Sequence, residues 1–461
     1  MKAILSQTFL FLLLMSISVQ AQQTTPPGGK PKDFSLPAKS AKSLSNGMKA
    51  TMVHYGVVPK VNISLMVKTG NVHEAADQVW LADLTGNLMK EGTATMNFTA
   101  ISKKVASMGG EISVNVGADQ TTISGSVLSE FAGDLIAILG DVAMNPAFPA
   151  SEIERLKNDL KRQLAVQKTR PQAQASEKFF KIIYGDQPYG RYFPTEEMLS
   201  RYTVDMVKDF YTSNFGAKRS VLYVVGQFDD AKVAASLEKT FSSWTAGPDV
   251  SYPASTVNRS NEVAVIDRKG APQTTVMVGL PMLTPRDPDF IAMSVTNSIL
   301  GGSFGSRITS NIREDKGYTY SPFSTIQNRI GSSIWYERAD VTTEHTGESL
   351  MEISKEISRL QKENPSKGEM EGIQKYEAGI FVLRNSTPGG IIGQLNFLDL
   401  YGLDDSYLTN RVKNIYAVTP EKVSQMAKDH LKYEDMTLVL VGDKTSIEKQ
   451  KKIMDDSRKI R

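Results

Sequence analysis

The chain has 461 residues, with 53 Lys and Arg against 50 Asp and Glu and a formal net charge of +3. This length exceeds what one hydrophobic core usually serves, so a single small domain is excluded and two or more domains are expected. The basic residues form no long run, which argues against nucleic acid as a partner, and the lack of Cys excludes disulfides, thiol catalysis and thiolate metal sites.

The first 21 residues have the pattern of a secretion signal. Lys2 provides a positive start, residues 9–15 form a short apolar core, and residues 19–21 (Val-Gln-Ala) match a small-x-small cleavage site. The apolar core is too short to span a bilayer comfortably, and no later window is long and apolar enough. We therefore expect a secreted chain with no integral membrane segment after signal cleavage, a retained anchor being the alternative. Residues 22–39 are expected to form a flexible lead-in.

The rest of the chain carries a pattern of elements that occurs twice. Apolar alternation and β-branched residues predict strands, and apolar residues at helical spacing predict amphipathic helices. The first half gives strands at 61–67, 111–116 and 221–226 and helices at 81–89, 101–108, 153–164 and 207–214. The second half gives strands at 274–280, 318–321 and 438–442 and helices at 291–299, 308–312, 351–360 and 423–431. The matching order indicates an internal repeat.

The boundary between the halves is predicted where glycine and proline interrupt regular structure. Residues 246–248 (Ala-Gly-Pro) and 251–253 (Ser-Tyr-Pro) have this composition. We therefore expect an α+β protein with domains at 40–245 and 263–461, joined by a linker at 246–262. Each domain of about 200 residues is of ordinary size.

The helix at 81–89 lies in a segment, residues 79–93, that resembles the zinc-binding helix of the insulinase (pitrilysin-like) metallopeptidases. That family carries His-x-x-Glu-His, two ligands and a general base, and a third ligand on a later helix. In this sequence Asp83 stands in place of the first His, Gly86 in place of the Glu and Asn87 in place of the second His. The third position falls at Gln163, with Asp159 as the alternative.

This donor set is a poor one for zinc, because carboxamides are weak ligands and glycine cannot accept a proton. We therefore expect no metal in this chain, with Asp83 and Asn87 hydrogen-bonded in the former pocket. Retained zinc catalysis and weak binding of a hard ion at Asp83 are the alternatives.

A second segment imitates a zinc motif of other proteases. Residues 73–77 read His-Glu-Ala-Ala-Asp, with Asp in the place of the last His. They fit either a metal site or a polar connection in which Glu74 lies near the positive end of the next helix. The four His of the chain, at positions 54, 73, 345 and 430, are not paired at metal-ligand spacing.

In the second half, residues 300–307 (Leu-Gly-Gly-Ser-Phe-Gly-Ser-Arg) and 311–320 (Asn-Ile-Arg-Glu-Asp-Lys-Gly-Tyr-Thr-Tyr) resemble the C-terminal half of the same family. There an Arg and a Tyr seven residues apart point at the zinc site, and here they match Arg313 and Tyr320. Arg offers a fixed fork of donors, and Tyr donates a hydrogen bond to an oxyanion. We expect Arg313 at a helix end and Tyr320 on the next strand, with a surface Arg and a half-buried Tyr as the alternative.

The resemblance implies two homologous α/β-sandwich domains, duplicated LuxS/metallopeptidase-like halves, that form a half-shell. Some bacterial peptidases of this family are split between a zinc-binding chain and a chain that supplies Arg and Tyr. The hypothesis is that this chain is the second kind, secreted across the inner membrane to the periplasm or outside and inactive alone. Its partners would be a zinc-binding peptidase subunit, which holds the zinc, and peptide substrates. The alternative is an inert peptide-binding or scaffold protein of the same fold; an independent protease with another metal site ranks last.

Overall fold

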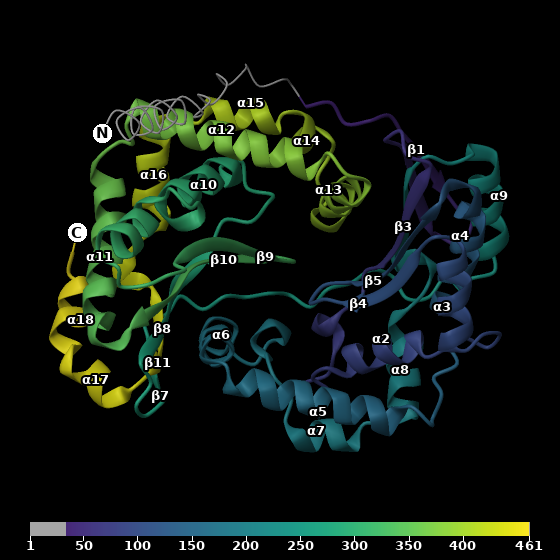
Figure 1. Ribbon diagram of the computed structural model, residues 1–461, viewed down its shortest axis with the longest axis horizontal. Helices are drawn as coiled ribbons and strands as arrows, with labels where there is room; N and C mark the ends of the chain where they lie inside the picture. Colours follow the sequence, from purple (N-terminus) through teal and green to yellow (C-terminus); the bar gives the residue numbers. More distant parts are fainter. Residues whose placement is uncertain (1–33, 461) are drawn as a thin grey trace, which may run out of the picture. The chain divides into compact units, whose positions relative to one another are not determined.

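The computed structural model describes residues 34–460, so the predicted secretion signal and residues 22–33 of the predicted lead-in lie outside the described residues. The described residues contain two β-sheets with helices around them (Figure 1). The expected α+β fold with two sheets is therefore confirmed. No helix within these residues has both the length and the apolar character needed to cross a membrane.

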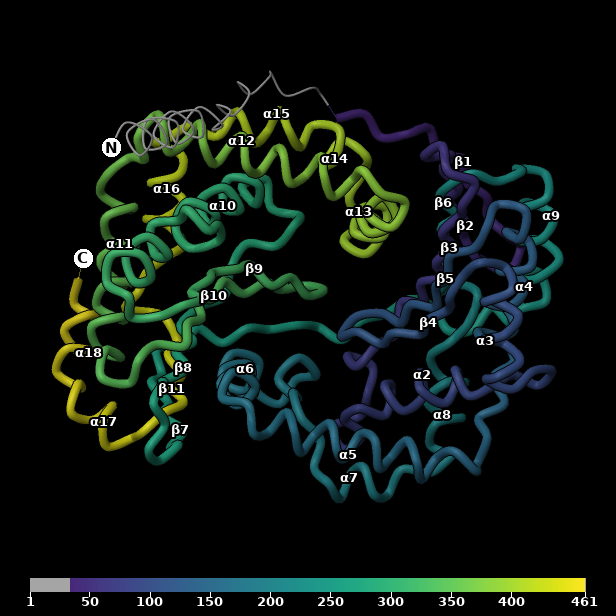
Figure 2. The backbone as a smooth tube through the Cα atoms, viewed as in Figure 1, coloured from purple at the N-terminus to yellow at the C-terminus, as the bar shows by residue number. Residues whose placement is uncertain are grey.

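The first sheet has the strand order β1-β2-β6-β3-β5-β4, in which only β2 and β6 are parallel (Figure 2). Its strands are β1 (Lys39–Ser43), β2 (Lys49–His54), β3 (Lys60–Val67), β4 (Glu111–Val116), β5 (Thr121–Leu128) and β6 (Ser220–Gly226). The helices of this half are α2 (Leu81–Lys90), α3 (Phe98–Ser107), α4 (Ala132–Met144), α5 (Ile153–Thr169), α6 (Pro171–Tyr184), α7 (Glu196–Arg201), α8 (Val204–Asn214) and α9 (Asp230–Phe241).

The second sheet has the order β7-β11-β8-β10-β9, and β7 and β11 form its parallel pair. Its strands are β7 (Val263–Asp267), β8 (Gln273–Met282), β9 (Phe323–Arg329), β10 (Ser332–Thr342) and β11 (Thr437–Gly442). The α-helices are α10 (Phe290–Asn297), α11 (Thr346–Lys362), α12 (Lys367–Arg384), α13 (Pro388–Tyr401), α14 (Ser406–Thr409), α15 (Arg411–Ala417), α16 (Pro420–His430), α17 (Lys444–Lys449) and α18 (Lys451–Ser457). Two further segments, η6 (Ser298–Gly302) and η7 (Thr309–Asp315), are π-helical.

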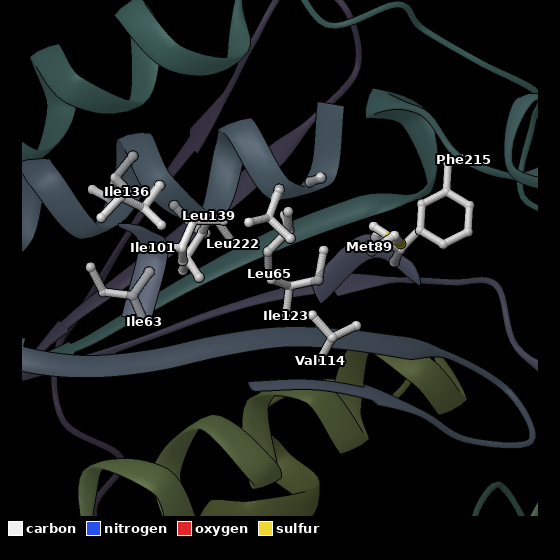
Figure 3. Packing of buried hydrophobic residues seen from close by; sticks show 14 of the residues in the cluster. Ile63, Leu65, Met89, Ile101, Val114, Ile123, Ile136, Leu139, Phe215 and Leu222 are labelled. Carbon is white, nitrogen blue, oxygen red and sulfur yellow. The ribbon is translucent and has the colours of Figure 1, made fainter. Parts of the chain in front are cut away.

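The last strand of the first half is β6 and that of the second half is β11, and both are buried along their whole length. Alternate side chains of a strand point to opposite faces, so a strand with both faces covered needs a continuous apolar run. Leu222 and Val224 point into the core that α2, α3 and α4 cover, part of which Figure 3 shows. Val221, Tyr223 and Val225 point to the opposite face.

Those opposite faces are covered by helices from the other half of the sequence. Helix α13 packs Ile391, Ile392 and Leu395 against the outer face of β6. Helix α6 packs Phe179, Phe180 and Ile183 against a face that includes Met277 of β8 and Val439 and Val441 of β11. The described residues 34–460 accordingly belong to one compact unit, and the domain boundaries given above stay a prediction.

The prediction of a strand at 318–321 is wrong. In this stretch only Thr319 forms a bridge, to Val341, and β9 begins later, at Phe323. Gly317 has a φ of +66°, and the Tyr318 N–H donates to the carbonyl of Ile312, so the chain is still closing the preceding helical segment. Pro322, which has no N–H to donate, then separates this turn from the strand.

Candidate functional site

Helix α2 carries the positions that correspond to a zinc motif. Its apolar residues, among them Leu84 and Leu88, are fully buried and fix the helix against the first sheet. Asp83 and Asn87 are half-buried and share one face, one turn apart. Gly86 is buried, and a Cβ atom at this position would lie 2.6 Å from Cγ2 of Val116 on β4. The space that a general-base side chain at position 86 would need is therefore occupied by the side chain of Val116.

Asp83 is joined to the preceding loop through Asn71. The Asn71 amide donates to Oδ2 of Asp83 at 2.7 Å and to Oε1 of Glu74 at 3.0 Å. Glu74 also accepts from the N–H groups of Ala82 at 2.8 Å and Trp80 at 3.1 Å, at the start of α2. The interpretation of residues 73–77 as a polar connection that ends at a helix N-terminus is therefore confirmed.

The two carboxyl groups of Glu74 and Asp83 have perturbed acidities. Burial raises the pKa of Glu74 to about 8, and the nearby charge of Asp83 raises it further against the opposing hydrogen bonds. Burial also raises the pKa of Asp83 to about 6, although its hydrogen bond from Asn71 opposes the shift. Glu74 thus holds a proton near neutral pH, and a protonated carboxyl group is a poor metal ligand.

The third expected position adds no suitable donor. Gln163 is exposed on α5. Asp159 is bound to Arg155 at 3.2 Å and also to Arg162. The donors at the family positions are thus one carboxylate and two amides, which do not fit zinc. Within residues 34–460 no group of three or more His, Asp and Glu is placed to hold a metal ion.

Arg313 and Tyr320 are brought together. Arg313 lies near the end of the π-helical segment η7, and its guanidinium carbon is 4.9 Å from the ring centre of Tyr320. Tyr320 is 80% exposed in the loop before β9, so the expected strand position and the half-buried alternative are both wrong. A third residue, Phe304, is 70% exposed and lies 4.4 Å from the same guanidinium carbon.

Phe304 was missed in the sequence, although a large aromatic residue between glycines was a usable signal. The rings of Phe304 and Tyr320 both lie against the guanidinium of Arg313, at cation–π distances. Glu314 approaches its Nε only to 3.5 Å. N–H groups at the edge of the Arg313 guanidinium are therefore available to donate to a ligand, and the exposed hydroxyl of Tyr320 is a further donor.

Neighbouring polar contacts hold the segments that carry these side chains. Arg307, in the glycine-rich segment, donates to both carboxylate oxygens of Glu369 on α12, at 2.8 and 3.0 Å. Asn311, on η7, donates to Glu352 and Glu356 of α11, at 3.0 and 2.8 Å. Both anchors follow Phe304 in the sequence and hold the chain that leads into and through η7, a π-helical segment of the kind that is rare in proteins but frequent at functional sites.

Comparison with known proteins gives two family matches. The model described as insulinase (peptidase family M16) matches residues 52–194, and the model described as peptidase M16 inactive domain matches residues 201–376. A protein described as an uncharacterized zinc protease from Rickettsia bellii (strain RML369-C) is 24% identical over 324 residues, which cover 70% of this chain and 78% of the relative.

Two solved structures have the same fold. A peptidase M16 inactive domain from Pseudomonas fluorescens aligns with a TM-score of 0.81 and 23% identity, over 88% of this chain and 98% of that chain. The first half of the periplasmic protease PqqL from Escherichia coli aligns with a TM-score of 0.72 and 14% identity, over 93% and 98%. The two family matches show that the chain belongs to the insulinase family, peptidase family M16, and that its residues 201–376 match the family's inactive domain.

Proposed function

We propose that this chain is the non-metal-binding subunit of a secreted zinc metallopeptidase complex and supplies Arg313 and Tyr320 to a catalytic partner subunit. The observation that carries the proposal is the meeting of these two side chains at one exposed place. The substituted positions on α2 support it, because a donor set that does not fit zinc leaves the metal chemistry to a partner. The similarity to one half of a periplasmic protease agrees with a paired assembly outside the cytoplasm.

In this role, the chain's own residues bind and polarise the peptide. The guanidinium edge of Arg313 donates to a substrate carbonyl or to a terminal carboxylate. The hydroxyl of Tyr320 donates to the carbonyl oxygen of the scissile bond as negative charge develops there. Loss of one such donor typically lowers kcat by a factor of about 100 or more.

The test uses the complex reconstituted with a secreted family member that carries an intact His-x-x-Glu-His, sought in the neighbouring reading frame. We expect Tyr320→Phe to lower kcat/KM for peptide hydrolysis about 100-fold while assembly is unchanged. Tyr376→Phe is the matched control, since Tyr376 is a 45% exposed tyrosine on α12. An unchanged rate in Tyr320→Phe and Arg313→Ala would remove the catalytic role.

An inert peptide-binding or scaffold protein is the second candidate. The exposed rings of Phe304 and Tyr320 beside a guanidinium favour it, because such a surface binds peptides without any chemical step. Under this alternative, Arg313→Ala weakens peptide binding to the isolated chain and leaves the partner's rate unchanged. Chelator-sensitive peptide cleavage by the chain alone contradicts both candidates.

A further inference from the structure

A second candidate site lies away from Arg313 and Tyr320, in the first half of the chain. An open cavity of about 800 Å³ is lined by the loop before α2, by helix α8 and by residues 251–253. Phe210 and Tyr252 contribute apolar surface to it, and Arg191 and Arg219 contribute positive charge. A cavity with both properties suits a ligand that is partly apolar and partly anionic.

Arg219 is buried without a counter-ion. Only 4% of this residue is exposed, and it forms no ion pair within residues 34–460. Its terminal nitrogens donate to four neutral oxygens. Nη1 donates to the Lys68 carbonyl at 3.4 Å and the Thr69 hydroxyl at 3.2 Å, and Nη2 donates to the Asp249 carbonyl at 3.0 Å and the Ser251 hydroxyl at 3.3 Å. Its Nε is buried and has no acceptor. A buried charge that meets only neutral dipoles is costly, and a bound anion would lower this cost.

Arg191, which is half-buried, lines the same cavity. Its Nε donates to the carbonyl of Asp186 at 3.0 Å, and Nη1 donates to the carbonyl of Glu74 at 3.1 Å. Both acceptors are main-chain oxygens, and Arg191 forms no salt bridge among the described residues. The pKa of the exposed Asp186 carboxyl is lowered mainly by its hydrogen bond from Lys181, and the charge of Arg191 helps to lower it. Two guanidinium groups therefore line one cavity, and neither forms a salt bridge within residues 34–460.

The other ionisable groups of the cavity do little to cancel this charge. The Glu74 carboxyl is turned toward the start of α2 and holds its proton near neutral pH. His73 accepts from the N–H of Gly70 at Nδ1, so its Nε2 donates to the carbonyl of Ser251 and the ring is neutral. Asp209 is exposed at the cavity and is the remaining acid of its lining.

We propose that this cavity binds the C-terminal residue of a peptide, with its carboxylate at Arg191 and Arg219 and its apolar side chain against Phe210 and Tyr252. Arg191 keeps its Nη2 without an acceptor among the described residues, so it can donate a charge-assisted hydrogen bond to the carboxylate. The donors of Arg219 already have acceptors or are buried, so Arg219 contributes its positive charge. The aromatic wall favours an apolar side chain over a small inorganic anion. The site stands without the heterodimer proposed above, because every residue that forms it belongs to this chain.

The test is calorimetric titration of the mature chain with N-acetyl-phenylalanine and with its amide, which lacks the negative charge. We expect the acid to bind at least about tenfold more tightly than the amide, and Arg191→Gln to weaken binding of the acid about tenfold. Asp209→Asn should tighten binding of the acid, because it removes the acid of the lining. Arg201→Gln is the matched control, since Arg201 pairs with Asp77 outside this cavity.

Several results would overturn the proposal. Equal affinities for acid and amide, or no binding of either, would show that the carboxylate is not recognised. Equal effects of Arg191→Gln and Arg201→Gln would place the ligand elsewhere. Inorganic phosphate that competes as well as the acid would show a general anion site without a role for the apolar wall. Arg219→Lys serves as a second variant that keeps the charge and should retain part of the affinity.

Discussion

Glu74 shows how a single carboxyl group can resemble part of a metal site and serve a helix instead. In the sequence it follows a histidine, as the glutamate of a zinc motif does. In the fold its side chain accepts two backbone N–H groups at the start of α2, where unpaired donors and the helix dipole favour an acceptor. The same enclosure removes water from the carboxyl group and raises its pKa to about 8.

This perturbed pKa predicts a pH dependence of stability. The usual value is 4.5, so Glu74 binds its proton more tightly in the folded chain than in the unfolded chain. Between these two values the folded state carries more protons, and the free energy of unfolding therefore falls as pH rises. One group contributes a slope of at most about 1.4 kcal/mol per pH unit. Glu74→Gln should make the decline between about pH 5 and pH 8 shallower, as measured by urea unfolding.

The matched control for this experiment is Glu197→Gln, which changes an exposed glutamate in the first turn of α7. It should leave the pH dependence as in the unmodified chain. The assignment of the effect to Glu74 would be wrong if both variants kept the original slope. A remaining slope below about pH 6 in Glu74→Gln is expected from Asp83, because its pKa is raised from 3.8 to about 6.

At the scale of elements, α2 and β4 are packed too closely for a side chain at position 86. Alanine normally stabilises a helix interior relative to glycine by about 1 kcal/mol. Here the added Cβ would lie 2.6 Å from Cγ2 of Val116, a β-branched residue with little rotamer freedom. We therefore expect Gly86→Ala to lower the free energy of unfolding by about 1–3 kcal/mol in thermal or urea unfolding.

Gly379→Ala provides the contrasting control, because Gly379 lies within α12 and its Cβ would meet nothing within 4 Å. This change should raise stability by up to about 1 kcal/mol. In the Gly86→Ala background, Val116→Ala should recover part of the loss by removing the clashing methyl group. If Gly86→Ala stabilises the chain as Gly379→Ala does, the close packing of α2 on β4 is incorrect.

The elements that the sequence predicted well are those whose pattern is local. Strand β3 and helix α2 have apolar residues at the spacing that burial on one face requires, so residues 61–67 and 81–89 were found nearly at their observed bounds. The prediction of a strand at 318–321 was wrong. Residues such as Thr319 and Tyr320 have the pattern of a strand, but Gly317 and Pro322 on either side favour a turn.

In the candidate sites too, contacts within one element could be predicted from the sequence, whereas contacts between distant segments could not. Asp83 and Asn87 could be placed together because four residues make one turn of a helix. The contact of Phe304 with Arg313, and the buried Arg219 beside Arg191, arise from segments that meet only in the folded chain. No local spacing encodes such contacts, because they depend on how the sheets and helices pack.

At the scale of the whole described chain, each half contributes a helix that packs against the sheet of the other half. Helix α6 covers a face of the second sheet, and α13 covers a face of the first. Each sheet therefore has one face whose apolar residues are buried by a helix from the other half of the sequence. If residues 40–245 and 263–461 are the domains, separating them would expose these faces to water and cost both sheets part of their hydrophobic stabilisation.

Because each half covers part of the other half's sheet, we predict that the two halves unfold together. Phe179 on α6 is fully buried against the second sheet, and Phe179→Ala should destabilise the chain by about 3–5 kcal/mol. Calorimetry of the chain should show one cooperative transition that moves to lower temperature as a whole in this variant. Phe304→Ala, which truncates a 70% exposed phenylalanine, is the matched control and should shift the transition little. Two separate transitions, with only one of them displaced in Phe179→Ala, would show that the halves are stable independently, because a shared core cannot be lost from one half alone.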